Sequence, residues 1–452
     1  MTTTRHDIAV VICNWNKCED VMACLTSLFA SDLQTFDVIV VDNASTDDSV
    51  KTIQRYFEDK VLLLQNSRNV GGAGGFYIGI ERAMSREYAY VMVLDNDVVI
   101  EPQTISTLRS FLNTHHEVGV VGAAIRVQQR PEQLQEFGAR LDLETFNVRP
   151  LHKAEDFCTA SLPEIEWCHY VPACAALVRM SVLRKAGNID PAYFVYWDDI
   201  DWCGRIRQAG YRIAAISTTS IQHKMGVKQV TNTFGTYYFW RNRTHYFGVN
   251  LSGRHLQSFA NVLFEDAFQA IFMSRFNEQP ELALTIWRAI YDALQGIRGE
   301  APTNRVFLRS PRPNRLSHDL TSSSIVVIHV AEDAVEIAVL LQLLAQFKDG
   351  HCIITGSPFV INKLHNRTNL NAVIVSDETI IEEPALHVHL CWHLTAQPSF
   401  ESGHIYVDRF FNQSVTDRDH QYMNSYQRLY RRCHNRLFWH LVSGLERLQS
   451  SK

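Results

Sequence analysis

The chain is organised around one stretch, VMVLDNDVV at residues 91–99. Its first four residues are apolar and predict a buried strand, which ends in two carboxylates, Asp95 and Asp97. Because side chains alternate along a strand, both acids point to one side, with Asn96 on the other. Two hard oxygen donors this close suit Mg²⁺ or Mn²⁺, which also takes phosphate oxygens as ligands. The alternative is a polar turn, since Asp and Asn are common in turns.

Strands and helices alternate ahead of this stretch. Apolar runs at 8–13, 37–41 and 61–64 predict strands, and the segments 18–29 and 47–57 between them predict helices. This alternation is typical of an α/β domain with a mostly parallel sheet. Ligands of such sheets bind beyond the carboxyl ends of the strands. We therefore expect one crevice to be shared by the polar residues that follow the strands: Asn14, Asp42, Arg68 and Asp95.

A glycine-rich segment, NVGGAGGF at residues 69–76, follows the third predicted strand. Its glycines, Gly71 and Gly72 among them, allow the backbone to approach a ligand closely, and the start of the helix behind them favours an anion. The segment is not a Walker loop, and it does not match the dinucleotide-binding GxGxxG pattern. A flexible linker is the alternative. Because the segment precedes the 91–99 strand, we interpret it as the wall of a nucleotide-diphosphate pocket.

A second acidic cluster lies in YFVYWDDIDWCGR at residues 193–205. Asp198 and Asp199 begin a run of three acids in four residues, which is costly to bring together unless something binds them. Capping of a helix start accounts for one acid. It does not account for the flanking Trp197 and Trp202, whose rings we expect to stack on a sugar.

Two further features follow the acidic cluster. His223 comes after a predicted strand at 213–216, where a lone histidine is usually a surface residue. Beside a metal at the 91–99 stretch, its imidazole is expected as a third ligand. The aromatic and basic cluster at 237–243, which includes Arg241, predicts either core packing or the lining of an acceptor groove.

Taken together, these motifs resemble family 2 glycosyltransferases, the inverting enzymes with the GT-A fold. Within that family they are most similar to bacterial rhamnosyl- and galactofuranosyltransferases. The resemblance covers about residues 6–300, and the segment ALQGIRG at 293–299 is similar to the final helix of that group. The motifs that carry the resemblance are more distinctive together than any one of them alone. They are VVICNWN, VIVVDNASTDDS, NVGGAGGF, VLDNDV, YFVYWDDIDWCGRIRQAGY and IQHKMG.

The resemblance implies how a donor would be bound. Mg²⁺ or Mn²⁺ on the donor diphosphate would be held by Asp95, Asp97 and His223. Asp42 would contact the nucleobase or ribose. The full set expected to contact the nucleotide or donor is Asn14, Asp42, Arg68, Asn69, Gly71, Gly72 and Asn96.

The resemblance also implies a catalytic base, Asp199. It would take a proton from the acceptor hydroxyl as that oxygen attacks the anomeric carbon from the face opposite the diphosphate, which inverts the configuration. Asp198, Trp197, Trp202 and Arg241 are expected to bind the sugar or the acceptor.

The implied function is transfer of rhamnose, galactofuranose or a related hexose from a UDP- or dTDP-linked donor. The acceptor would be a hydroxyl of a glycan or a lipid-linked molecule in bacterial cell-surface polysaccharide synthesis. A sugar nucleotidyltransferase is one alternative, but NVGGAGGF lacks the basic residue that a triphosphate needs. A non-catalytic nucleotide-sugar-binding or scaffold protein is another. The intact set of Asp95, Asp97, Asp199 and His223 argues against it.

Composition sets further limits. The net charge of −5 over 452 residues does not suggest a nucleic-acid binder. The sequence has no run of about 18 apolar residues and no signal peptide, so we expect a cytoplasmic protein, with peripheral contact at the inner face of the cytoplasmic membrane as an extension. Ten cysteines without a CxxC pair predict buried thiols rather than disulfides or a zinc site.

We expect four segments along the chain. Residues 1–250 form the GT-A domain, 251–300 a helical extension, 301–324 a proline-containing linker, and 325–452 a smaller α/β domain. The last domain ends in a basic amphipathic helix at 425–448. Such a helix packs on its own domain, on a second copy of the chain in a homo-oligomer, or on an anionic membrane.

Overall fold

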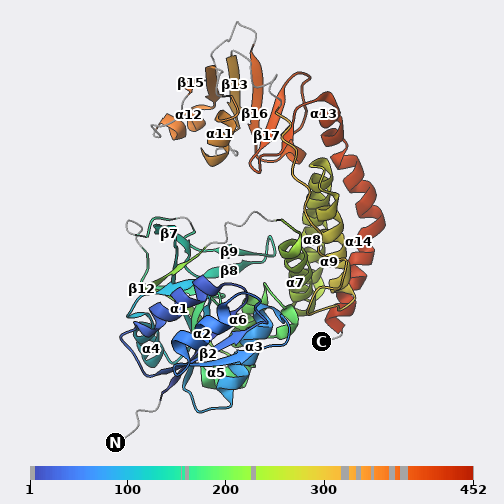
Figure 1. Cartoon of the computed structure of the whole chain (residues 1–452). Coiled ribbons are helices and arrows are strands. Elements are labelled where there is room, and N and C mark those ends of the chain that lie inside the picture. Colours follow the sequence, from blue (N-terminus) through green and yellow to red (C-terminus); the bar gives the residue numbers. More distant parts are fainter. Residues whose placement is uncertain are drawn as a thin grey trace, which may run out of the picture. The chain divides into compact units, whose positions relative to one another are not determined.

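The computed structural model shows two compact units (Figure 1). Unit 1 comprises Met1–Val262, Arg288–Phe307 and Ser443–Lys452, and unit 2 comprises Leu263–Trp287 and Leu308–Val442. The structure describes residues 6–450 except 154, 158–161, 225–230, 317–324, 332–336, 348–350, 366–371 and 377–384. The last two residues of the IQHKMG motif and the end of the predicted linker therefore lie outside the described residues.

Unit 1 is built on a ten-stranded sheet with the order β10-β12-β6-β11-β4-β1-β2-β3, in which β5 also pairs with β12 and β7 with β6. Strands β3, β2, β1 and β4 are parallel, as are β6 and β12, whereas β11 lies antiparallel between β4 and β6. The predicted α/β class with a large, mostly parallel sheet is confirmed. The strands are β1 (Ile8–Asn14), β2 (Phe36–Asp42), β3 (Val61–Gln65), β4 (Tyr90–Asp95), β5 (Val98–Ile100), β6 (Val118–Val127), β7 (Arg130–Glu136), β10 (Ile165–Cys168), β11 (Ala175–Arg179) and β12 (Arg212–His223).

The helices of unit 1 pack on both faces of this sheet. Apolar residues of α1, α2 and α4 join one core with alternate strand residues such as Val10 and Val40. Helix α3 packs on the other face, where Gly79 approaches Val11 and Val41. The short strands β8 (Ala139–Asp142) and β9 (Asn147–Pro150) form a separate antiparallel pair. The helices are α1 (Cys18–Phe29), α2 (Ser49–Phe57), α3 (Gly71–Met84), α4 (Thr104–Thr114), α5 (Met180–Ala186), α6 (Asp198–Gln208), α7 (Phe234–Asn250), α8 (Gly253–Phe276) and α9 (Pro280–Leu294). Helices α8 and α9 each belong partly to unit 1 and partly to unit 2.

The glycine-rich segment is not a loop. Helix α3 begins at Gly71, so the glycines occupy its first turns. Gly71 has a φ of +80°, and a Cβ there would lie 2.1 Å from the carbonyl oxygen of Phe194. A Cβ on Gly75 would lie 2.2 Å from the sulfur of Cys13. These glycines therefore allow close packing within the chain. Of the four in this segment, Gly72 alone faces open space.

Unit 2 contains a second, smaller α/β sheet, as expected from the sequence. Its order is β15-β14-β13-β16-β17-β18, and the first five strands are parallel. Strand β18 closes one edge antiparallel to β17. The elements are β13 (Ile325–Val330), α11 (Ile337–Leu344), β14 (His351–Gly356), α12 (Pro358–His365), β15 (Val373–Ser376), β16 (Leu386–Cys391), β17 (Ile405–Asp408), β18 (Gln413–Ser414) and α13 (Asp417–Asn424).

The C-terminal helix α14 (Tyr426–Ser450) buries its apolar face in the chain itself. Leu445 and Leu448 are buried, and both lie against Gly248 of α7 within unit 1. These contacts are with α7, a helix of the expected 1–250 domain, whereas the alternative predicted from the sequence was packing on the helix's own domain. Within the described ranges, no helix is long and apolar enough to cross a membrane. Each cysteine that the structure describes is a free thiol, as predicted.

Candidate functional site

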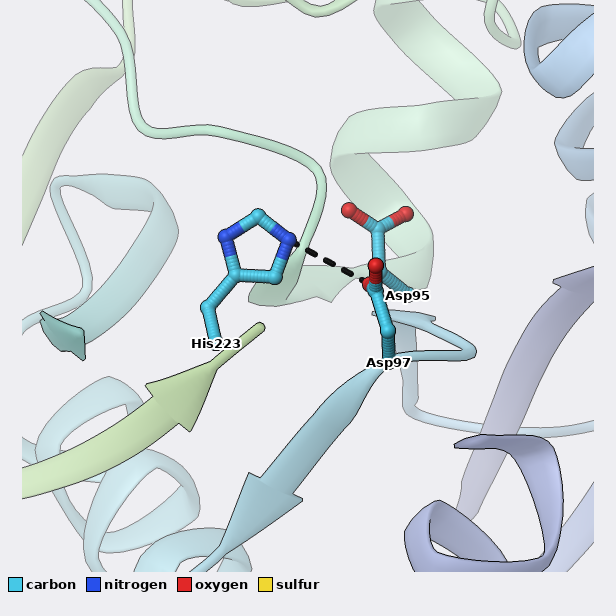
Figure 2. Close-up of side chains that lie close together, drawn as sticks. All are labelled: Asp95, Asp97 and His223. Atoms are coloured by element: carbon cyan, nitrogen blue, oxygen red, sulfur yellow. Dashed lines mark ion pairs between the residues drawn. The ribbon is translucent and has the colours of Figure 1, made fainter. Parts of the chain in front are cut away.

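Three side chains converge beyond the end of β4: Asp95, Asp97 and His223 (Figure 2). Asp95 is the last residue of β4, and Asp97 lies in the turn before β5. Strand β12 pairs with β5, which places its last residue, His223, beside that turn. One ligand atom from each residue lies within 4.8 Å of the other two, and His223 Nε2 is 3.3 Å from Asp97 Oδ1. Two carboxylates and an imidazole at this spacing fit Mn²⁺ or Mg²⁺.

The electrostatics of this cluster favour a cation. Burial raises the pKa of Asp95, and the neighbouring charge of Asp97 adds to the effect. Burial opposes ionisation of Asp97 as well, but hydrogen bonds from His223 and Lys17 lower its pKa to about 2. Burial alone would lower the pKa of His223, yet the hydrogen bond to Asp97 and the charge of Asp95 raise it. Lys17, which follows the VVICNWN motif, was not predicted from the sequence.

A hydrogen-bonded chain of side chains joins the carboxyl ends of β1, β2 and β4. Asn96 donates to Asn14 Oδ1 (2.8 Å), and Asn14 donates to Asp42 Oδ2 (3.1 Å). Asp42 also accepts from the backbone N–H of Ser45 (2.8 Å). The structure brings these three residues together, but all are buried, with Asn14 0% exposed, and their contact with a donor stays a prediction. Their hydrogen bonds therefore fix the strand ends beside the acids.

Arg68 and Asn69, which lie shortly before α3, differ in their surroundings. Asn69 Oδ1 accepts from the backbone N–H of Gly71 (2.8 Å), which stabilises the start of the helix. Arg68 is exposed and forms an ion pair with Glu300 (3.2 Å), a residue that the motifs do not include. Among the described contacts, none joins Arg68 to the Asp95 cluster, so its contact with a donor stays a prediction.

The second acidic pair, Asp198 and Asp199, opens helix α6 and is also buried. Burial raises the pKa of both carboxyls. The charges of Asp199 and Asp95 raise the pKa of Asp198 further, and the charge of Asp95 also raises that of Asp199. Asp199 Oδ1 accepts from the backbone N–H of Ile200 (2.8 Å), and the N–H of Ala173 also donates to this carboxylate. The charge of Asp95 thus acts on both members of the second pair. A carboxylate with a raised pKa is a better proton acceptor.

The loop that precedes these acids is strained. Phe194, Tyr196 and Trp197 all have positive φ (68°, 63° and 70°), which is rare for non-glycine residues. Asn242 of α7 holds the loop, because its side-chain amide donates to the carbonyls of Tyr193 (2.9 Å), Val195 (2.8 Å) and Tyr196 (2.9 Å). Such strain persists where the surroundings over-determine the backbone, commonly at functional sites.

Arg241 supports the same loop and does not line an acceptor groove. It is 1% exposed, and it donates to the carbonyls of Tyr193 (3.0 Å) and Gly299 (2.6 Å). Of the two interpretations of the 237–243 cluster, core packing is therefore correct. Neither the importance of Asn242 nor that of Arg241 has a sequence signal beyond polar residues in an apolar helix.

The prediction that Trp197 and Trp202 stack on a sugar is wrong. Their side chains are 3% and 1% exposed. Trp202 donates its indole N–H to the carbonyl of Gly187 (3.1 Å), so both rings belong to the core around α6. The exposed aromatic residues near the motifs are Tyr196 (50%) and Trp15 (52%).

Two neighbouring residues of β7, Gln135 and Glu136, interact with site residues although no motif contains them. Gln135 Oε1 lies 3.0 Å from His223 Nδ1. Glu136 is 8% exposed, and burial raises its pKa to about 7, although a hydrogen bond from Tyr170 and the charge of Lys153 act against the rise. Its Oε1 has no hydrogen-bond partner among the described residues, and its charge contributes to the raised pKa of Asp199.

The sequence is similar to those of known glycosyltransferases. The family model described as Glycosyl transferase family 2 matches residues 9–185, a segment that includes the Asp95 cluster except His223. An uncharacterized glycosyltransferase of Nostoc sp. is 26% identical over 205 residues, 42% of this chain and 56% of that protein. A galactofuranosyltransferase of Mycolicibacterium smegmatis is 25% identical over 238 residues, 52% of this chain and 76% of that protein. The solved structure of GalNAc-T7 with UDP, GalNAc and Mn²⁺ has a TM-score of 0.48 and 13% identity, covering 59% of this chain and 52% of that one.

Proposed function

We propose that this chain, whose residues 9–185 form a glycosyl transferase family 2 domain, is a metal-dependent inverting hexosyltransferase. Its donor would be a UDP- or dTDP-linked hexose such as galactofuranose or rhamnose. The acceptor would be a hydroxyl of a glycan or lipid-linked molecule in bacterial surface polysaccharide synthesis. The observation that carries the proposal is the convergence of Asp95, Asp97 and His223 in one electrostatic environment with the buried Asp199.

On the donor side, Asp95, Asp97 and His223 would hold Mn²⁺ or Mg²⁺. The bound ion supplies positive charge that offsets the negative charge developing on the departing nucleotide diphosphate. Lys17, which contacts Asp97, adds a second positive charge at this edge. Gly72 offers open space at the start of α3, where backbone N–H groups favour an anion. The galactofuranosyltransferase of Mycolicibacterium smegmatis supports galactofuranose as the first sugar to test.

On the acceptor side, Asp199 would take the proton of the attacking hydroxyl. The acceptor oxygen forms a bond to the anomeric carbon while the bond from that carbon to the diphosphate oxygen breaks, and the electron pair leaves with the nucleotide diphosphate. The proton remains on Asp199 until solvent removes it. The raised pKa of Asp199 supports this role, because it gives the carboxylate a higher proton affinity near neutral pH. The hydrogen bonds from Asn242 to the 193–197 loop support this role too, because they fix the position at which α6 starts.

Donor binding can be tested before any acceptor is known. A thermal-shift panel of nucleotide sugars, with and without Mn²⁺, should show stabilisation by one nucleotide class that depends on the ion. The donor found in this way is then incubated with a lipid-linked acceptor, and mass spectrometry should detect the addition of one hexose. If no nucleotide sugar stabilises the chain in the presence of Mn²⁺, the proposal fails.

A further inference from the structure

Gln135 holds one side of the His223 ring. Its Oε1 is 3.0 Å from Nδ1 of the imidazole, and on the far side of the ring Nε2 lies 3.3 Å from Asp97 Oδ1. The ring is therefore fixed between a neutral amide and a carboxylate. His223 itself is largely buried, so few other orientations are open to it.

Gln135 reaches His223 because of a bulge in β7. Ile125 of β6 pairs with Glu136, but the next residue, Arg126, pairs with Leu134, so Gln135 is an extra residue with no partner on β6. A bulge of this kind bends the strand and re-aims side chains, and bulges are over-represented next to active sites. Here it lets adjacent residues act on two different side chains. Gln135 lies against His223, and the charge of Glu136 raises the pKa of Asp199.

We propose that Gln135 is a positioning residue that fixes the tautomer of His223. A carbonyl oxygen only accepts hydrogen bonds, so with Oε1 facing the ring, Nδ1 must carry the proton. Nε2 donates to Asp97 in this structure, so a divalent cation would replace that proton and bind the lone pair of Nε2, while Nδ1 keeps its proton on Gln135. Partners of this kind orient metal-binding histidines in many proteins, and their loss typically weakens metal affinity by about 10- to 100-fold. The inference rests on the proposed function, because it requires that the Asp95 cluster binds metal.

The test uses Mn²⁺ alone with the full chain and needs neither donor nor acceptor. Electron paramagnetic resonance of free Mn²⁺ gives the dissociation constant for the wild type and for Q135L, which keeps a side chain of similar size but cannot accept a hydrogen bond. We expect Q135L to bind Mn²⁺ about 10- to 100-fold more weakly. Q133L is the matched control, since Gln133 lies on the same strand and its Oε1 has no hydrogen-bond partner among the described residues. It should bind as the wild type does.

A second measurement reports the tautomer directly. Nitrogen-15 NMR of the histidine rings, at a Mg²⁺ concentration that saturates the wild type, should show His223 protonated at Nδ1 alone in the wild type near pH 8 and still protonated at Nε2 in part of the Q135L molecules. Q135E restores an acceptor at the same place, so it should recover the single tautomer and Mn²⁺ affinity. Recovery in Q135E also separates a local effect from a general loss of folding.

The outcomes distinguish this inference from the proposed function. Wild-type Mn²⁺ affinity in Q135L, or a ring that stays protonated at Nε2 in the Mg²⁺-bound wild type, would overturn the role of Gln135 and leave the metal site intact. Absence of Mn²⁺ binding in the wild type would overturn the metal-dependent function, and the inference would fall with it. Weak binding in Q135L together with normal binding in Q133L and Q135E supports both.

Discussion

Two aspartates, Asp95 and Asp408, each end a parallel strand, one in each unit, but their surroundings are opposite. Asp408 ends β17 and accepts hydrogen bonds from the backbone N–H groups of Phe410 (3.0 Å) and Asn412 (2.9 Å) and from the Asn412 side chain (2.7 Å). Among the described residues, no hydrogen bond reaches the carboxylate of Asp95, and burial raises its pKa. One acid is satisfied by its own loop, and the other is held without such partners.

The same difference extends to the whole edge of each sheet. In unit 2, a cavity of about 320 Å³ lies at the carboxyl ends of β13, β14 and β16, where doubly wound sheets commonly bind ligands. Its described lining has no Asp, Glu, Lys or Arg, and its polar groups include His329, Thr355 and His389. In unit 1, the corresponding edge carries carboxylates, among them Asp42, Asp95 and Asp97. Two sheets of one class therefore differ in chemistry, because function depends on which side chains stand at the strand ends.

Removing the proton acceptor of unit 1 should have the largest effect. In D199N the amide cannot take the acceptor proton, so we expect the transfer rate to fall by about 10²–10⁴-fold. Mn²⁺ and nucleotide binding, measured by isothermal titration calorimetry, should remain. D201N is the matched control, because Asp201 is bound to Arg205 (2.8 Å) in the same helix. Transfer at the wild-type rate in D199N would remove Asp199 from the role of base.

Removing the unpartnered strand-end acid should cost metal binding and not stability. D95N loses one ligand, so Mn²⁺ affinity should fall by more than about 100-fold, beyond the range typical of residues that only orient ligands. Because the change also removes a buried charge that lacks hydrogen bonds, the melting temperature without metal should not decrease. A lower melting temperature in D95N, measured by differential scanning calorimetry, would show that this carboxylate is structural.

The equivalent change in unit 2 should do the reverse. D408N keeps an oxygen for the N–H groups of Phe410 and Asn412 but replaces Oδ2 by an NH₂ group that faces the side-chain amide of Asn412, and we expect a loss of about 3 kcal/mol in local stability. Hydrogen–deuterium exchange of β16 and β17 measures this loss, while Mn²⁺ affinity should be unchanged. If D408N weakened Mn²⁺ binding as much as D95N does, the contrast between the two edges would be lost.

The contrast also shows what the sequence can predict. Apolar runs of strand length located the parallel strands, and the polar residues directly after them had to share an edge, so Asn14, Asp42 and Asp95 were predicted together, whereas the role of Asp199 was implied only by the family resemblance. Periodicity does not tell which partner covers a residue. Trp197 and Trp202 therefore appeared available to a sugar, although their rings fill the core.

Residues that act through irregular backbone were missed for a related reason. Gln135 reaches His223 only through a one-residue bulge, and Asn242 matters only because three residues of a neighbouring loop have positive φ. Neither feature leaves a pattern in the residue types. The residue types also did not show that Gly71, Gly74 and Gly75 pack against the chain itself, because glycine permits close packing of the chain as readily as approach to a ligand.

The smallest effect tests whether the acidic edge of unit 1 costs stability. Burial raises the pKa of Glu136 from its ordinary value of 4.5 to about 7, so the folded chain holds this proton more tightly than the unfolded chain. The preferential protonation of Glu136 in the folded chain contributes fully to the free energy of unfolding below about pH 4.5. This contribution is lost as the pH rises to about 7, and the loss is at most about 3 kcal/mol at pH 8. E136Q cannot ionise, so its free energy of unfolding in urea should exceed that of the wild type at pH 8 and approach it at pH 5. E132Q changes an exposed acid of the same strand and should follow the wild type at both pH values. If E136Q and the wild type had the same free energy of unfolding at pH 8, ionisation of Glu136 would not destabilise the fold. The acids of this edge would then be as well stabilised by their surroundings as Asp408 is by its hydrogen bonds.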